Sequence, residues 1–221
     1  MTWIKICGTT NLEDALLAAH AGADAVGFVF YEKSPRRVTA EQVREIVKEL
    51  PDNVERIGVF VNEQKDSIFS IVDAVGLTGV QMHGDREDPR VADWILERRP
   101  QVKVLTAISM NHPDPRGWAM RWPPDKLQAF VVDSGSSSKH GGTGEVFDWA
   151  AAIPVVEDIK RIACIVAAGG LTSSNVGEAI RILKPWGVDV VSGVEARPGK
   201  KDPNKVHTFI GAVREMDRRV G

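Results

Sequence analysis

The sequence has few cysteines and no metal-ligand pattern, and these absences remove two classes of protein. Cys7 and Cys164 are the only cysteines among 221 residues, and neither belongs to a CxxC pair. A disulfide framework and a cysteine-based zinc site are therefore not expected. No His, Cys, Asp or Glu residues stand at a recognised ligand spacing either, so we expect no metal.

The sequence also lacks an excess of charge and a long apolar segment. It has 28 Lys plus Arg against 30 Asp plus Glu, which gives a formal net charge of −2. This balance offers no bulk attraction for nucleic acid or for an anionic membrane. No window approaches about 18 uninterrupted apolar residues, and the first residues do not resemble a secretion signal. We therefore predict a cytoplasmic protein that binds neither nucleic acid nor membrane, and that holds any anionic ligand in a local site.

What the sequence does contain is a series of short apolar runs rich in Val and Ile, each followed by a segment with helical periodicity. This alternation is typical of strands that are buried on both faces of a parallel sheet. Eight runs in 221 residues leave about 28 residues for each strand, helix and pair of loops. The runs are Trp3–Cys7, Ala25–Phe30, Arg56–Val61, Gly79–His83, Val102–Ala107, Ala129–Asp133, Ile162–Ala168 and Val188–Ser192.

Helix-start signals stand between the runs. Asn11 is a predicted N-cap, and Thr39 with Gln42 forms a capping-box pattern ahead of a helical segment. Residues 172–175 open a later helix by the same logic. The Pro-rich stretches around residues 112–117 and 122–125 are expected to frame a short helix.

Eight strand–helix units in this length predict an α/β protein with a single (β/α)8 barrel domain over residues 1–221. The alternative is an open doubly wound sheet. Neither GxGxxG nor a Walker motif is present, and Gly8-Thr-Thr-Asn11 follows the first run instead. In a barrel, the active site is expected at the C-terminal ends of the strands.

Polar and reactive residues do stand at those ends. Cys7 ends the first run, Gln81 and His83 end the fourth, and Asp133 ends the sixth. A closed parallel barrel would bring these residues together in one opening, although some lie more than 100 positions apart.

Glycine-rich turns follow the seventh and eighth runs. Gly169-Gly170 precedes a predicted helix, and Gly193 comes just after the eighth run. Glycine lets backbone N–H groups approach a ligand closely, and this end of a barrel is where phosphate often binds. The turns therefore favour a phosphate site, although tight-turn geometry alone would also call for glycine.

The two cysteines have different expectations. Cys7 could be a small buried apolar side chain, or a base or nucleophile if a nearby cation lowers its pKa. Cys164 lies inside the seventh run and is expected to be buried.

Asp133 directly follows the apolar residues of a predicted buried strand. Packing does not explain a carboxylate at this position. It could act on a ligand or cap the polar loop behind it. That loop suits a mobile cover, from which Lys139 and His140 could reach a ligand or remain solvated.

Arg36 and Arg37 stand in a basic turn after the second run. An arginine there could bind a substrate carboxylate through a bidentate pair, or could be surface charge. His83 could be a core histidine or a ligand contact.

The motifs, taken in order, resemble the phosphoribosylanthranilate isomerase family of tryptophan biosynthesis from end to end. The resemblance implies a (β/α)8 barrel and an Amadori rearrangement of N-(5-phosphoribosyl)anthranilate without a cofactor. The motifs are Lys5-Ile-Cys-Gly-Thr, Phe28-Val-Phe-Tyr-Glu-Lys-Ser-Pro-Arg-Arg, Gly58-Val-Phe-Val-Asn, Val80-Gln-Met-His-Gly, Asp133-Ser, Gly141-Gly-Thr-Gly, Phe147-Asp-Trp, Ala168-Gly-Gly-Leu and Asp189-Val-Val-Ser-Gly-Val-Glu-Ala-Arg-Pro-Gly-Lys-Lys-Asp.

The same resemblance implies roles. Asp133 is the general acid that opens the ribose ring, which requires a raised pKa, and Cys7 is the base that removes the proton on C2. Arg36 faces the anthranilate carboxylate. Positions near the phosphate, the sugar or the aromatic ring are Gln81, His83, Gly169, Gly170, Asp189, Ser192 and Gly193.

Some features depart from the family pattern, among them Met82 and the segments 85–89 and 112–124. They leave the oligomeric state open between monomer and homodimer. Two other functions remain to be weighed. A histidine-pathway aldose–ketose isomerase would carry aspartate where Cys7 stands, and a non-catalytic phosphosugar-binding protein would not need Cys7 and Asp133.

Overall fold

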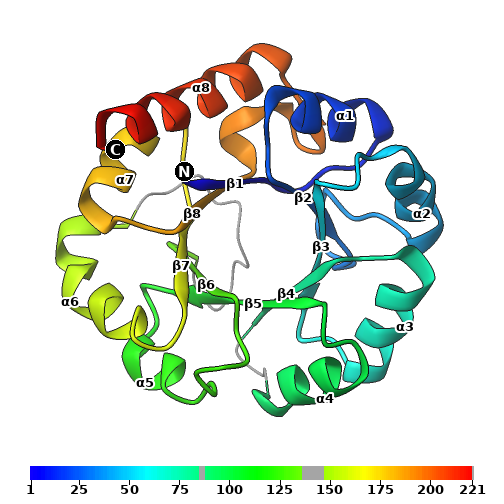
Figure 1. The fold of residues 1–221 in the computed structure, drawn as a ribbon, viewed down its shortest axis with the longest axis horizontal. Helices are drawn as coiled ribbons and strands as arrows, with labels where there is room; N and C mark the ends of the chain where they lie inside the picture. Colours follow the sequence, from blue (N-terminus) through cyan, green and yellow to red (C-terminus); the bar gives the residue numbers. More distant parts are fainter. Residues whose placement is uncertain (85–87, 136–146, 221) are drawn as a thin grey trace.

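The computed structural model describes residues 1–84, 88–135 and 147–220, and its centre is a closed barrel of eight parallel strands (Figure 1). The strands pair in chain order, and β1 pairs with β8 to close the barrel. The predicted (β/α)8 fold is confirmed. The strands are β1 (Trp3–Ile6), β2 (Ala25–Val29), β3 (Glu55–Val61), β4 (Gly79–His83), β5 (Lys103–Ser109), β6 (Ala129–Asp133), β7 (Cys164–Ala167) and β8 (Gly187–Val190).

Eight helices surround the barrel in the ring that Figure 1 shows. The predicted short helix is α5, which begins inside the first Pro-rich stretch and ends before the second. The helices are α1 (Leu12–Ala21), α2 (Ala40–Glu49), α3 (Lys65–Val75), α4 (Arg90–Arg98), α5 (Pro115–Ala119), α6 (Trp149–Ile159), α7 (Val176–Leu183) and α8 (Pro203–Val220).

The predicted caps explain where two of these helices begin. The Asn11 side chain accepts a hydrogen bond from the Asp14 amide at 2.9 Å. Thr39 and Gln42 form a reciprocal capping box at the start of α2. Residues 172–175 precede α7 as predicted, but the side chain of the N-cap residue Asn175 makes no capping hydrogen bond. Its side chain bonds the Thr172 amide and the Gly170 carbonyl instead, which fastens the turn after β7.

Alternation along the strands divides the core into two layers. Ile4 and Ile6 point outward and pack with the helices, whereas Trp3 belongs to a smaller cluster inside the barrel. Trp186 stacks on Trp3 with ring centroids 5.0 Å apart, and it covers the end of the barrel where the strands begin. By the same alternation, Lys5 shares the inner face with Trp3.

The structure corrects one prediction and adds one element. Cys164 is exposed rather than buried, because β7 begins at this residue and its first side chain lies at the rim. After β8 comes a 3-10 turn, η1 (Ser192–Val194), followed by a two-stranded hairpin of β9 (Glu195–Arg197) and β10 (Lys200–Lys201). The apolar runs gave no sign of this hairpin.

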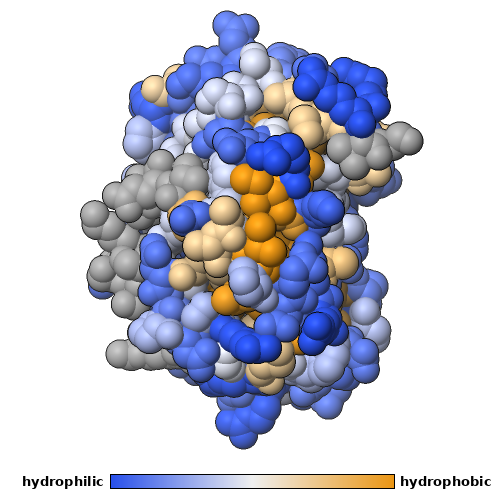
Figure 2. All heavy atoms as spheres, turned by 90° about the vertical axis from the view of Figure 1, so that its left-hand side faces the viewer, coloured by the Kyte–Doolittle hydropathy of each residue, from blue (hydrophilic) through white to orange (hydrophobic). Residues whose placement is uncertain are grey.

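Figure 2 shows the face over α6 and α7, where a strip of hydrophobic side chains lies among hydrophilic ones. On helix α6, Ile153 is 40% exposed. Within the described part of the chain, no helix is both long enough and apolar enough to cross a bilayer.

Candidate active site

A cavity opens at the C-terminal ends of the barrel strands and collects nearly all of the predicted site residues. Cys7 and Asp133 line it together, although 126 positions separate them in the sequence. Of the predicted residues only Gly193 does not line the cavity. The predicted residues that do are Cys7, Arg36, Gln81, His83, Asp133, Gly169, Gly170, Asp189 and Ser192.

Two glycine turns form one wall of this cavity. Gly169 and Gly170 both have positive φ angles, 79° and 64°, which other residues rarely adopt. A Cβ atom on Gly193 would overlap the carbonyl oxygen of Leu171, so only glycine lets η1 lie against the turn after β7. Within the described residues, the Gly169 and Gly170 amides donate to no other protein group. The wall therefore offers backbone N–H groups to an anion.

Cys7 lies at the floor of the cavity and is only 4% exposed. Its neighbour on β2 is Gly27, where any Cβ would come within 2.6 Å of the Cys7 sulfur. Burial raises the pKa of the thiol, while the ammonium groups of Lys5 and Lys201 oppose that rise. The two lysines thus favour the thiolate, the only form of cysteine that can accept a proton.

Beneath Cys7, Lys5 is fully buried and its Nζ lies 3.0 Å from Oδ2 of Asp189. Strand register makes this pair, since Lys5 and Asp189 are opposite partners in the β1–β8 ladder. Burial, the largest effect, would lower the pKa of Lys5, but Asp189 and Cys7 together outweigh it and the pKa is raised. Lys5 is therefore charged inside the barrel.

Asp133 uses its two carboxylate oxygens differently. Oδ1 accepts a hydrogen bond from the Gly135 amide at 2.8 Å, and Oδ2 lies 3.4 Å from Nε2 of His83. The carboxylate thus caps the turn behind it and also faces the cavity, where His83 accompanies it. Lys139 and His140 lie outside the described residues.

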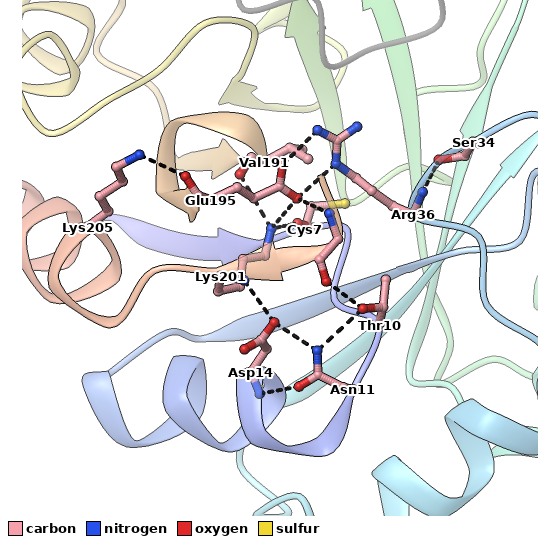
Figure 3. Close-up of polar contacts among 11 residues, drawn as sticks. Cys7, Thr10, Asn11, Asp14, Ser34, Arg36, Val191, Glu195, Lys201 and Lys205 are labelled. Carbon is pink, nitrogen blue, oxygen red and sulfur yellow. Dashed lines mark hydrogen bonds and ion pairs between the residues drawn. The ribbon is translucent and has the colours of Figure 1, made fainter. Parts of the chain in front are cut away.

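Arg36 reaches the cavity from the loop after β2, and Glu195 holds its guanidinium (Figure 3). Nε and Nη2 donate to the two oxygens of Glu195 at 2.9 and 2.7 Å. Lys201 adds a contact of 3.2 Å to the same carboxylate. Burial would raise the pKa of Glu195, yet the two cations lower it below its usual value. Arg37, by contrast, is exposed and pairs with Glu32 at the surface.

A larger groove lies between α3 and α4, away from the carboxyl ends of the other strands that line the cavity. Arg90 pairs with Asp88, and Lys65 lies over the Trp94 ring. It contains none of the predicted site residues.

The sequence that forms this barrel and its cavity matches a known protein family. Residues 4–212 match the family model for N-(5'phosphoribosyl)anthranilate (PRA) isomerase. The chain belongs to this family.

Individual relatives agree with the family assignment. The N-(5'-phosphoribosyl)anthranilate isomerase of Pelobacter propionicus is 46% identical over 215 residues, which is 97% of each chain. The crystal structure of phosphoribosyl anthranilate isomerase from Thermotoga maritima is 40% identical, with a TM-score of 0.85 over 97% of this chain and 100% of that one. A phosphoribosyl anthranilate isomerase complex with reduced 1-(o-carboxyphenylamino)-1-deoxyribulose 5-phosphate is 39% identical, with a TM-score of 0.83 and the same coverage.

Membership of the phosphoribosylanthranilate isomerase family decides between the alternatives raised by the sequence. The open doubly wound sheet is wrong, because the sheet closes as a barrel. The histidine-pathway alternative is also wrong as a family assignment. Among the described residues, no group of three His, Cys, Asp or Glu side chains could hold a metal ion.

Sequence reasoning did not predict two charged residues that lie beside the cavity, Lys5 and Glu195. Lys5 had one available signal, a charged residue inside an apolar run and two positions before Cys7. Glu195 stands in the last of the motifs that carry the resemblance, but its role depends on the hairpin that folds Lys201 against it.

Two hydrogen-bond acceptors that belong to cavity residues have no donor among the described residues. Oε1 of Gln81 and Oδ1 of Asp189 are buried without a hydrogen-bond partner among the described residues, and both residues line the cavity. Buried acceptors are costly to leave unpaired, so these oxygens are placed to receive donors from a ligand.

Proposed function

We propose that Cys7 and Asp133 are the base and the acid with which this phosphoribosylanthranilate isomerase converts N-(5-phosphoribosyl)anthranilate to 1-(2-carboxyphenylamino)-1-deoxyribulose 5-phosphate, a step of tryptophan biosynthesis. The observation that carries the proposal is the shared cavity: an aspartate and a cysteine line it together with two glycine turns and an arginine. No cofactor is required, because the reaction only moves protons within one substrate.

The substrate carries two anionic groups, and the cavity offers a separate partner for each. The amides of Gly169, Gly170, Ser192 and Gly193 are the proposed phosphate cradle, where glycine allows close approach. Arg36 is the proposed partner of the anthranilate carboxylate. Its Nη1 has no hydrogen bond among the described residues, so it can donate to a carboxylate while Glu195 holds the other side.

The sugar and the bridging nitrogen lie between these two anchors in the proposed complex. Gln81 and Asp189 each present a buried oxygen without a partner among the described residues. These oxygens would accept hydrogen bonds from ribose hydroxyls or from the amine N–H.

Ring opening is the proposed task of Asp133. Its carboxyl group gives a proton to the ring oxygen as the bond from that oxygen to C1 breaks, and the nitrogen lone pair forms the C=N bond of an iminium ion. His83, 3.4 Å from Oδ2, is the proposed hydrogen-bond partner that keeps this oxygen turned to the cavity.

Proton abstraction is the proposed task of Cys7. The thiolate takes the proton from C2, and the electrons of that bond form a C1=C2 double bond while the iminium nitrogen becomes neutral. A proton then returns to C1 and the C2 hydroxyl loses its proton, which gives the ketose. The two protons added, at the ring oxygen and C1, balance the two removed, from C2 and its hydroxyl.

Residues 1–221 are proposed to act as one barrel domain in the cytoplasm, as a monomer or a homodimer. One structural neighbour, which is 38% identical, is described as monomers generated from a dimeric phosphoribosylanthranilate isomerase. Which state this chain adopts can be measured by light scattering.

The proposed function is tested by mixing the protein with phosphoribosylanthranilate and following the loss of substrate fluorescence. We expect the parent chain to convert the substrate to the ketose. Chromatography with mass detection should show a product that is separated from the substrate and has the same mass. Binding without product formation would overturn the assignment and favour a phosphosugar-binding protein.

A further inference from the structure

Lys5 is a buried charge that the proposed reaction does not use. It is 0% exposed, lies inside the barrel and does not line the cavity that holds the substrate groups. A buried lysine is costly unless it is paired, so its retention in the interior calls for an explanation. The ion pair with Asp189 satisfies the charge of Lys5 without explaining why a charge is there.

The position of Lys5 relative to Cys7 supplies that explanation. Strand alternation places Lys5 and Cys7 on the same inner face, two residues apart. Both side chains border the small space beside Gly27: a Cβ there would lie 2.6 Å from the Cys7 sulfur and 3.0 Å from Cε of Lys5. The Lys5 ammonium group also acts electrostatically on the Cys7 thiol, whose pKa it lowers. The ammonium group therefore lies directly below the thiol.

Other charged groups also surround the thiol. Asp189 faces it from β8, Lys201 from β10 and Arg36 from the loop after β2, while Asp133 and His83 share the cavity above it.

Among the cations, Lys201 and Arg36 are already engaged elsewhere. Lys201 Nζ contacts the carbonyl oxygens of Cys7 and Val191 and a carboxylate oxygen of Glu195, which accounts for all three of its hydrogens (Figure 3). Arg36 is bound by Glu195. Lys5 is thus the cation that lies beside the thiol and is not bound to Glu195.

We propose that Lys5 is a positioning residue for the isomerase reaction: held by Asp189, it orients the Cys7 side chain and stabilises its thiolate. The inference rests on the proposed role of Cys7 as the base. Asp189 then has two functions, because Oδ2 fixes Lys5 while Oδ1 faces the cavity. Gly27 completes the arrangement by leaving room for both side chains.

The test measures the ionisation of Cys7 directly. In a Cys164→Ser background, Cys7 is the single cysteine, and the pH dependence of iodoacetamide alkylation reports its thiolate fraction. We expect Lys5→Met to raise the pH midpoint by about one to three units, since an opposite charge within contact distance lowers a pKa by that amount. Lys103→Met is the matched control, because it removes the same charge from the rim at the start of β5 and should leave the midpoint unchanged.

A second variant covers the case in which Lys5→Met leaves Asp189 buried without its partner and does not fold. Lys5→Met with Asp189→Asn removes both charges and is expected to raise the midpoint by a smaller amount, because Asp189 itself opposes the thiolate. Circular dichroism establishes that each variant is folded. A folded variant with an unchanged or lower midpoint would overturn the role of Lys5.

The pH profile of kcat/KM separates this inference from the proposed function. If both hold, the acidic limb of the profile moves up in Lys5→Met together with the alkylation midpoint. A midpoint that moves while the acidic limb stays in place would support the effect of Lys5 on the thiol and overturn Cys7 as the base.

Discussion

Glu195 binds Arg36 with both carboxylate oxygens, at 2.9 Å to Nε and 2.7 Å to Nη2, across 159 positions of sequence. Bidentate pairing fixes the plane of a guanidinium as well as its place. Because Arg36 also lines the cavity, its orientation toward a ligand depends on a hairpin residue outside the barrel.

Arg36→Gln should weaken substrate binding more than the chemical step. A hydrogen bond to a charged group contributes about 1.5 to 3 kcal/mol, so we expect KM to rise by roughly 10- to 100-fold with a smaller change in kcat. Arg37→Gln is the matched control, because this neighbouring arginine is exposed and pairs with Glu32 at the surface. Steady-state kinetics of both variants check the prediction, and equal effects at the two positions would contradict it.

Glu195→Gln should lower stability in a way that depends on pH. The variant leaves buried Lys201 and half-buried Arg36 without their carboxylate, at a cost of about 3 kcal/mol in unfolding free energy near neutral pH. The pKa of Glu195 is lowered in the folded chain, so its stabilisation is complete above the usual carboxyl pKa of about 4.5 and is lost as pH falls through the lower folded value. Urea unfolding of parent and variant should therefore converge in acid. A difference in unfolding free energy between parent and variant that grows below pH 4.5 would contradict this pH dependence.

Cys7→Ala and Asp133→Asn should each reduce kcat by about 10² to 10⁴, the usual contribution of an acid or base, while sparing much of substrate binding. Cys164→Ala, which changes the exposed cysteine at the start of β7, should leave kcat unchanged. The fluorescence assay measures all three. Retention of more than about a tenth of kcat by either site variant would remove that residue from its role.

Gly193→Ala should disturb the phosphate site specifically. The added Cβ would overlap the backbone carbonyl of Leu171, and a backbone neighbour can move only by displacing the turn after β7. We expect weaker competitive inhibition by inorganic phosphate together with a higher KM. Gly211→Ala is the control, since nothing lies within 4 Å of a Cβ at this helical position. It should be neutral or stabilising by up to about 1 kcal/mol. Loss of phosphate inhibition in both variants would point to a general effect of the substitution.

The sequence predicted the barrel well because its signals are local. Each strand is a short apolar run, and the caps at Asn11 and Thr39 use side chains within three residues of the helix start. The burial predicted for Cys164 was wrong for a related reason, because an apolar run does not show at which residue a strand meets the rim.

The sequence predicted the site residues that stand at strand ends. It did not predict residues whose contacts depend on how distant segments fold together. Parallel pairing brings Cys7, His83 and Asp133 to one opening, as their places at the ends of predicted strands indicate. Glu195 and Lys201 depend on how β9 and β10 fold back, and no periodicity reports a strand of two or three residues.

The seam of the barrel has a consequence for synthesis of the chain. Lys5 belongs to the first strand and Asp189 to the last, so the buried ammonium has no carboxylate partner until β8 has been made and paired with β1. A nascent chain that ends before residue 187 can form seven strands but leaves Lys5 and Cys7 beside an open edge. Pairing of β8 with β1 therefore closes the sheet and gives Lys5 its carboxylate in a single event, which comes late in the synthesis of the chain.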